Sequence, residues 1–386
     1  MTPKQRNRWF LWGAAGVVGA GIGIWMLERT GSSPPEVRTE TADISPLPEK
    51  SSPAVSPPVS TAEINPPQKP AAAPSMQQRV LALNDKVNAA KEELEGLSAP
   101  EMLERLQDAF KRDDDILLNI AKERLITLGR QGDEAVQQAL QSAIRSSSPP
   151  LQAYLIGALG EIGNEKALAG LLDILNSPIA QTGDSRIAAL DAIAHIGQSP
   201  PENASLETLS GLLEKNFDLA ETDPLRRNAL LSGLSSVGAA SGIEKILRES
   251  ERLEQSKQMT PELEDSIFSS LRELRNPDAL PTLEARLRQD PAMRLKTTRA
   301  TGEALASMGE PRATETLLKW AAEVSSPEQM QQALDWLSQV RDEQSLQILQ
   351  HADENHRFRD PKMREEINRL ANEIDRANTP DLDVDD

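Results

Sequence analysis

A two-helix unit recurs seven times in residues 113–350, and this recurrence constrains the fold more than any other feature of the chain. The unit is clearest in residues 151–175, where apolar residues recur every three or four positions on both sides of Gly163. A glycine at that point supplies the left-handed conformation that ends a helix. The pattern therefore predicts two antiparallel helices joined by a tight turn.

The ends of the first helices set the period of the repeat. Successive ends are separated by 34, 34, 41, 37, 34 and 32 residues, which is typical of helix-pair solenoids. The seven ends are Leu125 to Gly129, Leu159 to Gly163, Ile193 to Gly197, Leu234 to Gly238, Leu271 to Arg275, Leu305 to Gly309 and Leu337 to Arg341.

Two columns of aliphatic residues run through these ends. The first column is Leu125, Leu159, Ile193, Leu234, Leu271, Leu305 and Leu337, and the second is Leu128, Ile162, Ile196, Val237, Leu274, Met308 and Val340. A lone helical hairpin cannot cover its apolar face, so such units stack and bury a continuous seam. We therefore expect an all-α fold, an α-solenoid of about seven helix pairs.

One run of the repeat resembles a known family. The residues LGEIGNEKALAGLLDIL, at positions 159–175, resemble the HEAT repeat, especially the short bacterial variety that is also found in phycobilisome lyases. The resemblance covers residues 113–350 and is weaker where Arg275 and Arg341 replace the turn glycine. It implies an α-solenoid that offers a long surface to another macromolecule. It implies no catalytic residue, because the matching positions are core and turn positions.

Helical segments flank the repeats, and we expect residues 76–112 and 351–378 to cap them. The first segment carries an apolar stripe with a strict 4-3 spacing, which suits either a coiled coil or packing against the repeats. In a parallel homodimer Lys86 would face Lys91 of the other copy, so packing against the repeats is favoured over pairing. The stripe is Met76, Val80, Leu83, Val87, Ala90, Leu94 and Leu97. Ser98 followed by Glu101 predicts the start of a second helix.

The first 27 residues have the pattern of a membrane anchor. Residues 1–8 are basic and predict a cytoplasmic stub, and residues 9–27 are uncharged and long enough for a transmembrane helix. A cleaved signal peptide is the alternative, with a weak cleavage site at residues 18–20. Ala15, Gly19 and Gly23 form a row of small residues through which two such helices can pack.

Residues 28–75 predict a disordered linker, because eleven of the 27 prolines fall within residues 32–75. We expect this segment to act as a spacer rather than as a ligand for an aromatic groove. The repeats would then lie in the periplasm, beyond the inner membrane. The last residues, 379–386, contain four aspartates and no basic residue, so a disordered acidic tail is expected.

The composition excludes several classes of site. With no cysteine, the chain has no disulfide, thiol nucleophile or zinc-thiolate site, and with three histidines imidazole-based metal sites and triads are disfavoured. His351 and His356 lie near two acidic residues, but their spacing puts them on different faces of a helix. The net charge of −18 disfavours nucleic acid as a partner. We expect no catalytic residue, no metal and no cofactor.

Basic residues gather in one stretch of this acidic chain. Residues 272–299 contain seven basic residues and four acidic ones. The basic residues are Arg272, Arg275, Arg286, Arg288, Arg294, Lys296 and Arg299. They are candidates for docking an acidic partner, and the alternative is ordinary pairing within helices, as for Glu284 with Arg288 or Asp290 with Arg294. Further candidate contacts are Glu165, Lys166 and Lys319.

These observations lead to a functional expectation. We expect a membrane-anchored scaffold that binds other proteins of the bacterial cell envelope without catalysis, with the second helix of each pair on the contact face. One alternative is an enzyme of the phycobilin-lyase kind, which needs a pigment-sized cleft with an acid or a base. Another is a membrane-anchored lipase foldase, whose aromatic-rich motif has no counterpart in this sequence.

Overall fold

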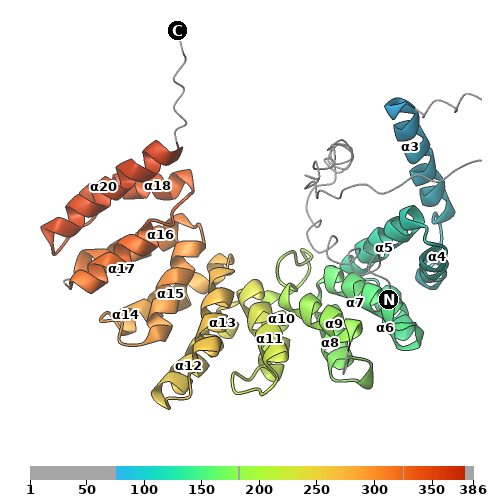
Figure 1. Ribbon diagram of the computed structural model, residues 1–386, viewed down its shortest axis with the longest axis horizontal. Helices are drawn as coiled ribbons and strands as arrows, with labels where there is room; N and C mark the ends of the chain where they lie inside the picture. Colours follow the sequence, from blue (N-terminus) through green and yellow to red (C-terminus); the bar gives the residue numbers. More distant parts are fainter. Residues whose placement is uncertain (1–74, 181–182, 325, 379–386) are drawn as a thin grey trace, which may run out of the picture. The chain divides into compact units, whose positions relative to one another are not determined.

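The computed structural model describes residues 75–180, 183–324 and 326–378. Over these ranges the chain forms α-helices, two short 3₁₀ helices and no β-strand. Figure 1 shows the helices following one another in chain order, from α3 in blue to α20 in red. The helices of this part of the chain are α3 (Met76–Glu93), α4 (Ala99–Arg112), α5 (Asp115–Arg130), α6 (Glu134–Ser146), α7 (Pro149–Ile162), α8 (Glu165–Leu175), η1 (Pro178–Ala180), α9 (Asp184–Ala194), α10 (Leu206–Asn216), α11 (Pro224–Val237), α12 (Ala240–Gln255), α13 (Pro261–Arg272), η2 (Pro277–Ala279), α14 (Leu280–Gln289), α15 (Lys296–Ser307), α16 (Pro311–Glu323), α17 (Pro327–Leu337), α18 (Glu343–Gln350), α19 (Ala352–Asn355) and α20 (Pro361–Asn378).

Caps and turns place the helix ends. At the start of α4 the Ser98 backbone N–H donates to Glu101 Oε2 at 2.8 Å, which confirms the predicted helix start. Between α7 and α8, Gly163 has a φ of 69°, a left-handed value that glycine adopts without a Cβ penalty. Asn164 then caps α8, because its Oδ1 accepts from the Ala167 N–H at 2.9 Å. The predicted tight turn at Gly163 is confirmed.

The helices form two layers, because each helix from α3 to α16 contacts the helix two places further along the chain. We call α3, α5, α7, α9, α11, α13, α15 and α17 the first layer, and α4, α6, α8, α10, α12, α14, α16 and α18 the second layer. At the end of the array α20 contacts both α17 and α18. The result is an all-helical array packed in series, consistent with an α-solenoid.

The predicted aliphatic seam lies in the core of this array. Thirteen of its fourteen residues are at most 5% exposed, and the remaining one, Leu128, is half-buried against the others. The buried apolar residues form one cluster that extends from Ala90 in α3 to Ile374 in α20. The helix pairs therefore share a single core, which confirms the prediction of a continuous seam.

Two of the predicted turn glycines have other roles. Gly129 lies inside α5, and the positive φ in that turn belongs to Gly132, at 92°. Gly197 has no positive φ, but a Cβ placed on it would lie 2.2 Å from the backbone nitrogen of Val237 in α11. Gly197 thus allows a close approach between the backbones of neighbouring units. The sequence gives no sign of this contact, because Gly197 and Val237 are 40 positions apart.

Several expectations concern residues outside the described ranges. These are the stub at residues 1–8, the transmembrane segment at 9–27 with Ala15, Gly19 and Gly23, the linker at 28–75 except Ser75, and the tail at 379–386. Within the described ranges, no helix is long and apolar enough to span a membrane.

Candidate functional site

The seven basic residues of the predicted docking region lie on α13, α14, α15 and the loops between them, and three of them pair with acidic residues of neighbouring helices. Arg272 Nε donates to Glu303 Oε2 at 2.7 Å, from α13 to α15. Arg286 Nη1 lies 2.7 Å from Glu251 Oε2 in α12 and is largely buried. Lys296 pairs with Glu264, and Arg288 Nη2 lies 3.0 Å from Glu284 Oε2 within α14. Arg272, Arg286 and Lys296 therefore link neighbouring helices, whereas Arg288 pairs within its own helix.

The three remaining basic residues differ in their surroundings. Arg275 Nη1 donates to the carbonyl oxygens of Arg272 and Leu274, each at 2.7 Å, at the end of α13. Arg294 and Arg299 are exposed and make no ion pair with another described residue. The pairing expected between Asp290 and Arg294 within one helix is wrong, because α14 ends at Gln289.

Asp290 instead holds the loop that follows α14. Its Oδ2 accepts from the Leu295 N–H and from the Thr298 hydroxyl, each at 2.9 Å. Burial alone would raise the pKa of Asp290, but these hydrogen bonds and the nearby Arg286 lower the pKa below its ordinary value. Asp290 is thus a capping residue of the loop.

A polar groove opens between α6 and α8 in the second layer. Its volume is about 350 Å³, and we call it the α6–α8 groove. On the α6 side the polar residues recur at helical spacing, whereas α8 presents two small residues at the middle of the groove. The lining residues are Glu134, Gln137, Gln138 and Gln141 from α6 and Lys166, Ala169, Gly170 and Asp173 from α8.

Small residues on α8 leave the room for this groove. A Cβ on Gly170 would lie 2.4 Å from Gln141 Nε2, so the Gln141 side chain lies directly against the glycine. At one end of the groove Lys166 pairs with Glu134 across the two helices. At the other end Asp173 is exposed, with no hydrogen bond or ion pair to another described residue. The groove therefore has one free carboxylate beside a row of carboxamides.

The deepest of these carboxamides belongs to Gln137, which is only 3% exposed. Its Nε2 donates to Asn164 Oδ1 at 3.0 Å, and Asn164 Nδ2 donates to the Gly129 carbonyl oxygen at 3.0 Å. This chain of hydrogen bonds joins α5, α6 and α8 across two units. Gln137 Oε1 has no hydrogen-bond partner. The network orients the groove residues on rigid helices.

Of the other candidate contacts, Lys166 lines the α6–α8 groove, while Glu165 accepts from the Ser205 N–H of the next unit. Lys319 pairs with Glu315 on its own helix, with Nζ 2.8 Å from Oε1. A second cavity, of about 410 Å³, lies at the starts of α15 and α17 and is lined in part by Arg299 and Glu328. The structure thus distributes the predicted site residues over several places rather than bringing them together.

Tyr154, His351 and His356 lie in different surroundings. Burial lowers the pKa of His356, which the nearby Glu315 opposes, and its ring lies edge-on to Phe358. His351 Nδ1 lies 2.8 Å from the Gln347 carbonyl oxygen, at the end of α18. Burial raises the pKa of Tyr154, and the carboxylate of Glu161 adds to this shift. No group of three metal-ligating side chains comes together among these residues.

The α6–α8 groove was not predicted from the sequence. Its signal is the run of polar residues at positions 134, 137, 138 and 141 of α6, which share one face of a helix. The partner face on α8 combines an alanine and a glycine. Neither pattern predicts a groove unless the two helices are known to be neighbours.

No protein-family model and no curated protein matches this chain.

Proposed function

We propose that this chain is a membrane-anchored scaffold that binds other proteins of the bacterial cell envelope and catalyses no reaction. In this proposal residues 9–27 anchor the chain in the inner membrane, residues 28–75 are a disordered spacer, and the helical array lies in the periplasm. The seven HEAT-like units are the pairs from α5 and α6 to α17 and α18. The flanking helices α3 and α4, with α19 and α20, cap them.

The observation that carries the proposal is the α6–α8 groove. The carboxamides of Gln138 and Gln141 each offer a donor and an acceptor, which suits the backbone amides of an extended protein segment. The exposed carboxylate of Asp173 suits a basic side chain of that segment. Such a groove recognises a chain rather than transforming it, because it contains no nucleophile paired with a base.

The membrane anchor allows a weak contact between the α6–α8 groove and a partner chain to be sufficient for binding. A groove of about 350 Å³ takes only a short stretch of a partner chain, so the affinity of the groove alone is expected to be modest. Confinement to one membrane raises the effective concentration of the partners for each other. The second-layer surface beyond the groove adds contacts along the array, as in other helix-pair solenoids.

Site-specific photo-crosslinking of the full-length chain in intact cells tests this function. We expect a photoreactive residue at Gln138 to give discrete adducts with envelope proteins, and the same residue at Arg124, exposed on α5 in the first layer, to give none. Adding Asp173→Asn should reduce the Gln138 adducts several-fold, whereas Glu343→Gln on α18 should not. Equal adducts at both positions, or none at Gln138, would contradict the proposal. The chain itself should remain in the membrane fraction.

A further inference from the structure

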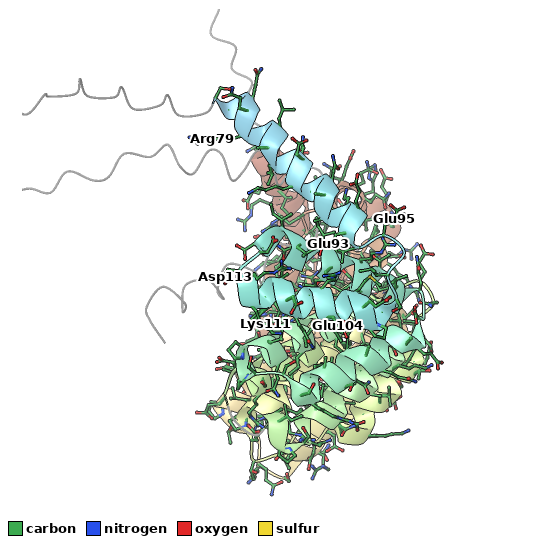
Figure 2. The ribbon with its side chains drawn as sticks, turned by 90° about the vertical axis from the view of Figure 1, so that its right-hand side faces the viewer. Arg79, Glu93, Glu95, Glu104, Lys111 and Asp113 are labelled. Atoms are coloured by element: carbon green, nitrogen blue, oxygen red, sulfur yellow. The ribbon has the colours of Figure 1, made fainter. Side chains whose placement is uncertain are left out.

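Helix α3 divides into two halves with different surroundings. In its second half Ala90 is buried, and Leu94 at the C-cap is buried too, where the helix contacts α5. In its first half Met76, Val80 and Leu83 are 59%, 41% and 50% exposed. Figure 2 shows the end of α3 that carries Arg79 lying away from the other helices, whereas the end with Glu93 lies beside them. The apolar stripe of α3 is therefore only half covered by the array.

We propose that a second copy of this chain covers the other half, by pairing in parallel through residues 76–87. In the heptad register of the stripe, Val80 and Val87 occupy a positions, and Met76 and Leu83 occupy d positions. Valine at a with leucine at d favours two parallel strands over larger assemblies. The occupant is thus an identical helix in the same register.

The charges beside the stripe agree with the parallel orientation. In a parallel pair Arg79, at a g position, lies across from Asn84 of the other copy, at an e position. In an antiparallel pair Arg79 lies across from Lys86 of the other copy, and symmetry places this like-charge contact there twice. The parallel arrangement is therefore the favoured one.

From the sequence, a parallel homodimer was disfavoured because the positive charge of Lys86 would face that of Lys91 in the other copy. Lys91 lies in the half of α3 where Ala90 and Leu94 already pack into the array. Two copies that pair through residues 76–87 must separate before that point, because a single helix face cannot contact both the array and a partner. The two lysines then no longer face each other.

The small size of the paired surface sets its strength. Three side chains about half exposed on each copy fall well short of the roughly 1,200 Å² in total that stable interfaces bury. Pairing therefore depends on a high local concentration, and this part of the inference rests on the membrane anchor of the proposed function. A parallel pair also directs both preceding segments toward the same side, as two chains anchored in one membrane require.

Cysteine crosslinking tests the pairing directly, because the chain contains no cysteine of its own. In membranes containing the full-length chain, Leu83→Cys at a d position should form a disulfide-linked dimer under mild oxidation. Asp85→Cys, on the opposite face at an f position, should form at least tenfold less. Equal yields from the two variants, or no dimer from Leu83→Cys, would overturn the proposal.

A second pair of variants separates the stripe from exposed apolar surface in general. Val80→Cys should also crosslink, and adding Leu83→Glu should abolish the dimer. Adding Leu81→Glu should leave it unchanged, because Leu81 is 62% exposed but occupies a b position outside the stripe. Loss of the dimer with both glutamates would show that the register is wrong. The readout is a link between two copies, so it is independent of the adducts expected at Gln138.

Discussion

At the scale of single residues, the glycines of α7 show how closely the first layer packs. Gly157 and Gly160 are separated by less than one turn of the same helix. A Cβ on Gly160 would lie 2.6 Å from the Cβ of Ala192 in α9, whereas a Cβ on Gly157 would meet no atom within 4 Å. One glycine is thus required by the neighbouring unit, and the other only weakens the helix.

This difference predicts opposite effects for the same substitution. Gly157→Ala should raise the free energy of unfolding by about 0.5–1 kcal/mol, because alanine costs less conformational entropy in a helix. Gly160→Ala should lower it by about 1–3 kcal/mol, because the added methyl group overpacks the contact with α9. Thermal and urea unfolding followed by circular dichroism measure both. The same sign for the two variants would show that α7 and α9 do not approach as closely as described.

At the scale of helices, two arginines take the place of the left-handed glycine found at Gly163, Gly238 and Gly309 in other units. Arg275 contacts the carbonyl oxygens of Arg272 and Leu274 at the end of α13, and Arg341 contacts those of Ser338 and Val340 after α17 in the same way. The last carbonyl groups of a helix lack partners and carry partial negative charge. A guanidinium group donates hydrogen bonds to these carbonyl oxygens, and its positive charge offsets their partial negative charge. These units therefore end their first helices without a left-handed residue.

Removal of this cap should destabilise the protein. We expect Arg275→Ala to lower the free energy of unfolding by about 1 kcal/mol, because the carbonyl groups of Arg272 and Leu274 lose a charged donor. Arg294→Ala is the matched control, since Arg294 is an exposed arginine of the adjacent unit without a described ion pair, and it should change stability by no more than about 0.5 kcal/mol. Urea unfolding midpoints compare the two. An equal loss in both would argue against a capping role for Arg275.

At the scale of the whole array, each unit is stabilised by its neighbours. Near the end of the array Trp336 in α17 is fully buried, and its ring lies beside that of Trp320 at 5.1 Å between centroids. The ring also lies against Gly302 in α15, where a Cβ would be 2.1 Å from Trp336 Cζ2. This contact joins two successive units of the first layer, as nearest-neighbour coupling in repeat proteins requires.

A methyl group at Gly302 should therefore act locally. Gly302→Ala should displace the Trp336 ring and speed amide exchange in residues 296–350 by roughly 10- to 100-fold, while residues 115–175 keep their protection. Hydrogen exchange measured by mass spectrometry on the full-length chain resolves these segments. Gly211→Ala in α10, where no atom lies within 4 Å of the new Cβ, is the control and should not speed exchange. Uniformly faster exchange would mean that the array unfolds as one unit.

The helical class and the shared seam were predictable from the sequence. Every unit buries the same face of its first helix, so the spacing of Leu, Ile and Val reports burial directly. Residues such as Leu159 and Leu234 are fully buried as that spacing predicts. Turn positions were less certain, as Gly129 and Gly197 show, because glycine serves close packing as well as left-handed turns.

The polar contacts were decided only by the tertiary structure. Whether Arg272 is free or paired depends on Glu303, 31 positions away, and whether α6 and α8 enclose a groove depends on Gly170 meeting Gln141. Likewise, the stripe of α3 is continuous in the sequence, but packing against α5 covers only its second half. Periodicity along one helix shows which face is apolar. It does not show which other helix, if any, covers that face, because that depends on contacts between residues far apart in the chain.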